Sequence, residues 1–198
     1  MEADTSGRPS DDVLMAKHSD RIYLTGYRGT GKTTVGKLIS TELSTQCVDL
    51  DQAIEAAAGK TIREIFEEGG EALFRDWETR CLHRSGGEGS VARVVSLGGG
   101  AILRKENRDF MRQTGVCIWL TARADTLAAR IAEDETTGHR RPALTGLSPA
   151  DEIQVLLAKR EPLYREAADL ILATDDKLPQ ELAAQVVAWL QDQSGSRI

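Results

Sequence analysis

The segment best suited to chemistry is a glycine-rich run early in the chain, Gly26-Tyr-Arg-Gly-Thr-Gly31-Lys32-Thr33, which matches G-x-x-x-x-G-K-[ST]. Glycines let the backbone turn tightly, so that several N–H groups converge on phosphate oxygens. The ammonium group of Lys32 suits the β- and γ-phosphates, and the hydroxyl group of Thr33 suits Mg²⁺. The alternative is an ordinary glycine-rich turn, although a chance match is expected in roughly one chain of a hundred. The motif therefore predicts nucleotide binding.

The rest of the sequence limits the class of nucleotide-binding enzyme to which this chain can belong. A GTPase needs an Asn-Lys-x-Asp motif for guanine, but the only asparagine is Asn107. The Asp-x-x-Gly matches, Asp4–Gly7 and Asp192–Gly195, lie near the chain ends. The apolar run Val94–Leu97 continues into glycines without the carboxylate that would help to hold a metal ion. A carboxylate must therefore come from elsewhere, and the missing guanine motif argues against a GTPase.

Val48-Asp49-Leu50-Asp51 supplies two carboxylates. Residues i and i+2 of a strand point to the same side, so Asp49 and Asp51 should project together beside the phosphate loop, at the carboxyl edge of a sheet. Alternatively, Asp51 is the N-cap of a helix over Gln52–Ala58.

The elements that must position these residues alternate between short apolar runs and longer amphipathic stretches, as in repeated βα units around a parallel sheet. Val35, Leu38, Ile39 and Leu43 form one helical stripe directly after the loop. Thr61-Ile-Arg-Glu64 matches a capping box, and Ser148-Pro149 matches another helix start. The chain is thus predicted to be α/β, with strands over Arg21–Thr25, Gln46–Leu50, Arg93–Leu97, Val116–Leu120 and Asp169–Leu172.

Three segments lack such periodicity. Residues 1–20 carry acidic, Gly, Pro and Ser residues and are expected to be a disordered leader. Residues 133–148 contain two glycines and a proline and are expected to form a flexible lid. We expect one nucleotide-binding domain over 21–192 and a flexible tail over 193–198.

Composition limits the functional class. The chain has 198 residues, with 31 Asp and Glu against 25 Lys and Arg, and a formal net charge of −6. This acidic balance argues against coating a nucleic acid. No apolar run approaches the ~18 residues of a membrane span. Three scattered cysteines indicate neither disulfides nor a zinc site. We expect a monomeric, cytoplasmic protein without a nucleic-acid or membrane partner.

Taken together, the motifs of residues 21–192 resemble those of the shikimate kinase family. The matching pieces are the phosphate loop, VDLD, Glu71-Ala-Leu-Phe-Arg75, Leu97-Gly-Gly-Gly100, Arg140-Arg-Pro142 and Ala158-Lys-Arg-Glu-Pro-Leu-Tyr164. The resemblance implies a three-layer fold whose five-stranded parallel sheet has the order 2-3-1-4-5. It also implies transfer of a phosphoryl group from ATP to shikimate, giving shikimate 3-phosphate and ADP.

The resemblance further implies residue roles. Asp49 and Thr33 would hold Mg²⁺, and Asp51 would hold the shikimate hydroxyl groups and assist deprotonation. The catalytic set would be Lys32, Asp51 and Arg141, the last of which resembles a lid arginine, with Arg140 beside it as the other candidate. The residues implied to bind ATP are Gly26, Gly29, Thr30, Gly31, Lys32, Thr33, Thr34, Arg130, Arg141 and Pro179, with Arg130 and Pro179 enclosing adenine.

For shikimate, Arg75 and Arg160 resemble the two arginines that grip the carboxylate, since a guanidinium fork matches a planar carboxylate. Gly98, Gly99 and Gly100 resemble the turn against which shikimate lies, and Gly99 is the best single match.

Structural alternatives exist for both arginines. Arg75 could form only a solvated helix pair with Glu71 or Glu78. The positive charge of Arg160 could instead stabilise the C-terminal end of a helix near Pro162 through the helix dipole. If either alternative holds, the chain could be another small-metabolite kinase, acting on gluconate or a nucleotide. A separate alternative is a catalytically inactive nucleotide-binding regulator, and the joint presence of Lys32, Thr33, Asp49, Asp51 and Arg141 argues against it.

Overall fold

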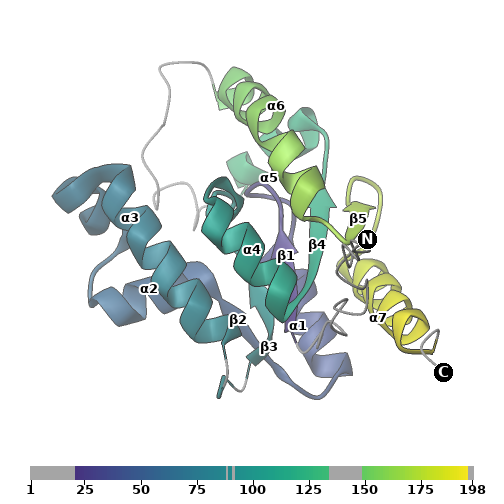
Figure 1. Cartoon of the computed structure of the whole chain (residues 1–198). Coiled ribbons are helices and arrows are strands. Elements are labelled where there is room, and N and C mark those ends of the chain that lie inside the picture. The colour runs from purple at the N-terminus through teal and green to yellow at the C-terminus, as the bar shows by residue number, and fades with distance from the viewer. Residues whose placement is uncertain (1–20, 88, 91, 134–148, 196–198) are drawn as a thin grey trace, which may run out of the picture.

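A parallel sheet of five strands forms the centre of the molecule. The computed structural model describes residues 21–87, 89–90, 92–133 and 149–195. The strand order is β2-β3-β1-β4-β5, as predicted (Figure 1). Each predicted strand boundary lies within one residue of the observed one, and the strands are β1 (Arg21–Thr25), β2 (Gln46–Asp49), β3 (Ala92–Ser96), β4 (Gly115–Thr121) and β5 (Leu170–Ala173).

Helices cover both faces of this sheet. One face packs on α1 and α7, and the other packs on α3, α4 and α6, with α2 lying against α3. The predicted three-layer α/β fold is therefore confirmed. The helices are α1 (Lys32–Glu42), α2 (Leu50–Ala58), α3 (Ile62–Gly86), α4 (Lys105–Thr114), α5 (Ala124–Glu133), α6 (Pro149–Ala167) and α7 (Pro179–Gly195), with a short 3₁₀ turn η2 (Ala101–Leu103) before α4.

The central strand β1 is apolar on both sides because both sides are covered. Ile22 and Leu24 pack toward α1 and α7, whereas Tyr23 packs toward α3 and α4. All three side chains are fully buried. The helical stripe predicted after the phosphate loop is also observed, because Val35 and Ile39 are buried against the same apolar cluster.

Two local features shape α3. Its start is fixed by the predicted capping box: the Glu64 amide donates to Thr61 Oγ1 (3.2 Å), and the Thr61 amide donates to Glu64 Oε2 (2.7 Å). The helix is interrupted at Gly69 and Gly70, and Gly70 has φ 64° and ψ −162°, a conformation essentially restricted to glycine. The part of α3 after Gly70, which carries Arg75, is therefore set at an angle to the part before Gly69.

The C-terminal helix is longer than expected. Helix α7 extends to Gly195, beyond the predicted domain end at residue 192. The predicted leader over residues 1–20, the last three residues and positions 134–148 of the predicted lid lie outside the described residues.

The carboxyl ends of the five strands lie at one edge of the sheet, and open α/β sheets usually bind their ligands at this edge. The neighbours of β1 are β3 on one side and β4 on the other, so the direction of strand addition reverses at β1. Clefts at this switch point are the usual binding sites of open α/β sheets. The phosphate loop follows β1 directly.

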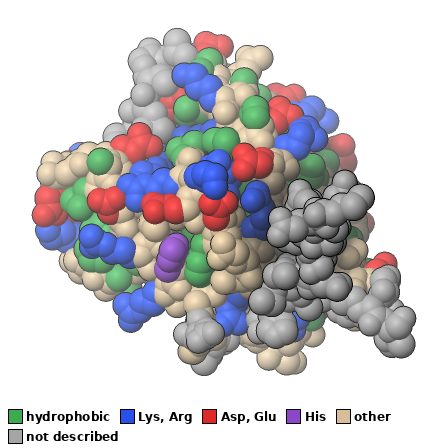
Figure 2. All heavy atoms as spheres, viewed as in Figure 1, with side chains coloured by type: hydrophobic (Ala, Val, Ile, Leu, Met, Phe, Trp, Pro, Cys, Tyr) green, Lys and Arg blue, Asp and Glu red, His purple; other side chains and the backbone are tan. Residues whose placement is uncertain are grey.

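The face formed by α3, α4 and α6 carries acidic and basic side chains interspersed with one another (Figure 2). Several of them pair, as in Arg104 with Asp76 and Lys105 with Asp109. Within the described part of the chain, no helix is long and apolar enough to cross a membrane.

Candidate active site

The phosphate loop connects the end of β1 to the start of α1, which is the predicted strand–loop–helix context. Gly26, Gly29 and Gly31 have φ values of 140°, 83° and 82°, in a region that favours glycine. A Cβ atom at Gly26 would lie 2.2 Å from the Leu120 carbonyl oxygen. Gly31 also has no side chain to cap the first N–H groups of α1, so these amides can receive an anion.

The ammonium group of Lys32 lies within this loop. Its Nζ donates to the carbonyl oxygens of Gly26 (2.9 Å) and Tyr27 (2.8 Å), and the side chain is buried. Thr30 tightens the same turn by donating from Oγ1 to the Tyr27 carbonyl (2.8 Å). The positive charge is thereby held where the loop amides converge, and Thr34 follows on the exposed side of α1.

Three oxygen-bearing side chains meet beside Lys32, from three separate elements. Thr33 Oγ1 donates to Asp49 Oδ2 (2.7 Å) and lies 3.3 Å from Ser96 Oγ. Asp49 and Ser96 are register partners at the carboxyl ends of β2 and β3. Hydroxyl and carboxylate oxygens are the donors that Mg²⁺ prefers. Among the described residues, no group of three or more His, Cys, Asp or Glu side chains could hold a metal ion.

Asp49 and Asp51 differ from the expected strand pair. Strand β2 ends at Asp49, and α2 begins at Leu50, so Asp51 lies in the first helical turn. The N-cap is Asp49, because its Oδ1 accepts from the amides of Asp51 (3.1 Å) and Gln52 (3.2 Å). The interpretation of Asp51 as the cap is therefore wrong. Asp51 is half-buried at the same edge of the sheet, two residues beyond the strand end.

Arg75 forms the helix pairs with Glu71 and Glu78 that the structural alternative predicted, but its side chain is buried and not solvated. Its guanidinium group donates to Glu71 Oε1 (3.0 Å and 3.2 Å) and to Glu78 Oε2 (2.5 Å), and Glu78 is fully buried. Burial alone would lower the pKa of Arg75, but the Glu78 and Glu71 carboxylates outweigh this effect and raise it. A Cβ atom at Gly100 would lie 2.3 Å from Arg75 Nη2, so the guanidinium group rests on that glycine.

Arg160 reaches the neighbouring glycine from the other side. Helix α6 continues through Pro162 to Ala167, so Arg160 lies within the helix and the prediction of a helix end beside it is wrong. The side chain is buried, and Nη1 lies 3.4 Å from the Gly99 carbonyl oxygen. The structure therefore brings Arg75 and Arg160 to adjacent residues of one turn, Gly98–Gly100.

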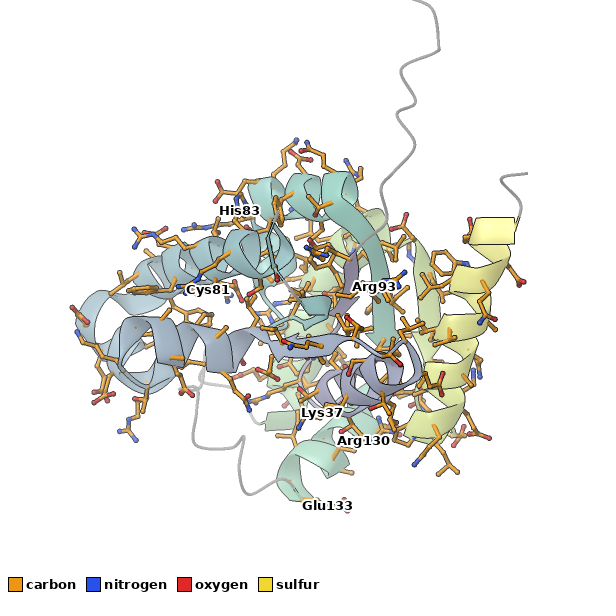
Figure 3. All side chains as sticks on the ribbon, turned by 90° about the horizontal axis from the view of Figure 1, so that it is seen from below. Lys37, Cys81, His83, Arg93, Arg130 and Glu133 are labelled. Atoms are coloured by element: carbon orange, nitrogen blue, oxygen red, sulfur yellow. The ribbon has the colours of Figure 1, made fainter. Side chains whose placement is uncertain are left out.

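Arg130 joins the phosphate loop to the loop between β5 and α7. Its guanidinium group donates to the Gly29 carbonyl (3.3 Å), to Thr174 Oγ1 (2.9 Å) and to the Thr174 carbonyl (2.7 Å). Pro179 begins α7 at the end of that second loop. Arg130 and Glu133 come from α5, away from Cys81 and His83 on α3 (Figure 3). Arg140 and Arg141, the two candidates for the lid arginine, lie outside the described residues.

Several residues of this edge were not singled out from the sequence. Ser96 interrupts the otherwise apolar run Val94–Leu97, which is a signal that could have been used. Tyr27 occupies a variable position of the loop motif, yet its buried ring lies 5.9 Å from the Arg160 guanidinium carbon. Tyr164 and Thr174 also contact predicted site residues, but only tertiary packing brings them there.

The comparisons with known proteins agree with this geometry. Residues 28–191 match the family model described as shikimate kinase. A shikimate kinase of Rhodopirellula baltica is 46% identical over 182 residues, covering 90% of this chain and 92% of the relative. One of Symbiobacterium thermophilum is 39% identical over 171 residues, covering 86% and 96%. A solved shikimate kinase of Acinetobacter baumannii in complex with shikimate has a TM-score of 0.80 and 33% identity, covering 89% of this chain and 96% of that one.

Proposed function

The chain belongs to the shikimate kinase family, and we propose that the carboxyl edge of its sheet transfers the γ-phosphoryl group of ATP to the 3-hydroxyl group of shikimate. The observation that carries this proposal is the convergence of two buried guanidinium groups, Arg75 and Arg160, on adjacent glycines of one turn. That turn lies directly against the phosphate loop, because a Cβ atom at Gly99 would be 3.1 Å from the Gly26 carbonyl oxygen.

The nucleotide binds through the phosphate loop. The amides of the loop and of the first turn of α1 surround the β- and γ-phosphates, since a helix N-terminus favours negative charge. Lys32 then exchanges its carbonyl contacts for phosphate oxygens and neutralises the charge that develops during transfer. Arg130 and Pro179 enclose the adenine ring, and the attachment of Arg130 to both Gly29 and Thr174 supports this assignment.

Thr33 and Asp49 hold the Mg²⁺ ion that accompanies ATP. Their oxygens already lie 2.7 Å apart at the mouth of the loop, which fits a small cation that prefers oxygen ligands. When bound, the ion neutralises charge on the β- and γ-phosphate oxygens. Asp49 remains oriented throughout, because its second oxygen is held by the helix N-terminus that it caps.

Shikimate binds between α3, α6 and the glycine turn. Arg75 and Arg160 each present a planar fork to the substrate carboxylate. Gly98, Gly99 and Gly100 leave room for the ring, and Asp51 accepts a hydrogen bond from the hydroxyl group that attacks ATP. Transfer then depends mainly on in-line positioning and on charge stabilisation.

Arg141 completes the catalytic set by reaching the ATP phosphates from the lid over residues 133–148, with Arg140 as the other candidate. This assignment rests on the family resemblance. Closure of the lid would exclude water, which could otherwise accept the phosphoryl group. We further propose a monomeric enzyme of the cytoplasm without a nucleic-acid partner. The acidic net charge of −6 supports the absence of a nucleic-acid partner.

A coupled assay of ADP release tests the function. The purified full chain with MgATP should release ADP on addition of shikimate, and ³¹P NMR should identify shikimate 3-phosphate as the product. Gluconate and nucleoside monophosphates serve as controls for the other small-metabolite kinases. ADP release with one of these controls and none with shikimate would overturn the proposal.

A further inference from the structure

Resting on the proposed substrate site, we propose that Tyr164 is a positioning residue for shikimate. Its hydroxyl group donates a hydrogen bond to the Gly99 carbonyl oxygen. The Arg160 guanidinium group can then bind the substrate carboxylate.

The hydroxyl group of Tyr164 is a fixed donor. The side chain is fully buried, and Oη donates to the Gly99 carbonyl oxygen at 2.5 Å. The ring stacks on Trp119 with 5.5 Å between the ring centroids, so the phenol cannot easily swing away. Burial raises the pKa of Tyr164, although Arg160 partly opposes this shift. The hydroxyl group consequently keeps its proton, and stays a donor, throughout the neutral pH range.

Arg160 shares the same acceptor with Tyr164. Arg160 and Tyr164 are four residues apart on α6, so they lie on the same face of the helix. Arg160 Nη1 is 3.4 Å from the Gly99 oxygen, a longer contact than that of Tyr164. A buried carbonyl group that loses its donor is unfavourable. If the phenol hydroxyl were removed, Arg160 would therefore turn toward Gly99 and away from a bound carboxylate.

The glycine turn transmits this effect because it has little room to move. A Cβ atom at Gly99 would lie 3.1 Å from the Gly26 carbonyl oxygen, 3.4 Å from the Tyr164 hydroxyl and 3.5 Å from Tyr27 Cα. The turn is thus held between the phosphate loop and α6. Tyr164 fixes its α6 side without itself reaching the proposed substrate.

The test is Tyr164→Phe, which keeps the ring and its stacking but removes the hydroxyl group. We expect the shikimate KM to rise about three- to tenfold, as for loss of one neutral hydrogen bond. The ATP KM and kcat should stay within about twofold of the parent values. A variant that is only less stable would not raise the shikimate KM while leaving the ATP KM unchanged.

Tyr23→Phe is the matched control. Tyr23 is also fully buried, and its hydroxyl group hydrogen-bonds Thr114 Oγ1 at 2.7 Å, at the end of α4 and outside the proposed site. Both variants should lower the melting temperature by similar amounts, but Tyr23→Phe should leave the shikimate KM unchanged. If Tyr164→Phe melts below the assay temperature, calorimetric titration with shikimate in the cold gives the same comparison.

A double-variant cycle identifies the route of the effect. In an Arg160→Ala background, Tyr164→Phe should cause no further rise in the shikimate KM, because the guanidinium group that Tyr164 releases is gone. An unchanged KM in Tyr164→Phe, an equal rise in Tyr23→Phe, or a fully additive rise in the Arg160→Ala background would each overturn the inference. A parent enzyme that does not phosphorylate shikimate would instead overturn the proposed function.

Discussion

The hydroxyl group of Thr33, in the first turn of α1, donates a 2.7 Å hydrogen bond to Oδ2 of Asp49, at the end of β2. The other oxygen of the same carboxylate caps α2. Asp49 therefore serves the fold through one oxygen and the proposed metal site through the other. Substitutions can separate these two roles.

Asp49→Asn should impair catalysis but not stability, because asparagine is as good an N-cap as aspartate but carries no charge. We expect kcat/KM for MgATP to fall about ten- to a hundredfold, as for loss of a charge-assisted contact, and the Mg²⁺ concentration at half-maximal rate to rise. Asp49→Ala should show the same kinetic loss and, in addition, melt about 2–4 °C lower, since a cap contributes about 1 kcal/mol. Equal melting temperatures for the two variants would contradict the capping role.

Lys32→Met should abolish phosphoryl transfer, with a loss of at least about a hundredfold in kcat. The fold should persist, because the charge contacts loop carbonyls and not the apolar core. Lys37→Met is the control, since Lys37 is exposed on the same helix. Substantial turnover by a well-folded Lys32→Met protein would refute the assigned role.

Gly100→Ala should act through Arg75. The φ value of Gly100 is −110°, which alanine adopts without strain, but the added Cβ would lie 2.3 Å from Arg75 Nη2. The flexible guanidinium group must move, so the shikimate KM should rise about tenfold or more. The ATP KM should hardly change, whereas the melting temperature should fall because the buried contact between Arg75 and Glu78 is disturbed. In an Arg75→Ala background the substitution should have little further effect on KM, and a full additional effect would indicate another cause.

Cys47 should resist alkylation at neutral pH. Burial, and next the nearby Asp49 carboxylate, raise its pKa to about 11. The thiolate is the reactive form, and at pH 8 only about one thiol in a thousand carries it. Modification by iodoacetamide, followed by mass spectrometry, should be slow at pH 8 and accelerate as the pH rises toward 11. The urea-unfolded chain provides the control, and rapid labelling of the native protein at pH 8 would contradict the shift.

The α/β layers could be predicted from the residues because the signals for them are local. Apolar runs separated by amphipathic stretches define βα units, and the resemblance supplied the order. The interruption of α3 at Gly69–Gly70 and the continuation of α6 through Pro162 were not foreseen. Both depend on tertiary packing, which decides whether a glycine pair breaks a helix or whether a proline is tolerated inside one.

The sequence indicated the candidate residues of the site, but it did not indicate the contacts between them. The motif located Lys32 and Thr33, yet nothing local shows that Arg75 is buried against Glu78 or that it rests on Gly100. The same holds for Tyr164, whose acceptor Gly99 lies 65 positions away in the sequence. Asp51 was misplaced because strand geometry was extended two residues beyond the end of β2, into the first turn of α2.

The central claim is that Arg75 and Arg160 bind the substrate carboxylate, and the shikimate KM of the variants Arg75→Lys and Arg160→Lys tests it most directly. Lysine keeps the charge but loses the planar fork. Each single variant should raise the shikimate KM about ten- to a hundredfold, with the ATP KM nearly unchanged. Arg63→Lys is the control, because Arg63 is exposed on α3 and pairs only with Glu67 among the described residues.

The same measurement on a substrate whose carboxylate is replaced by an amide completes the test. The parent enzyme should lose a similar factor in KM with the amide, and the double variant should lose little more, because the fork and the carboxylate act as one contact. A shikimate KM that is unchanged in both single variants would contradict the account.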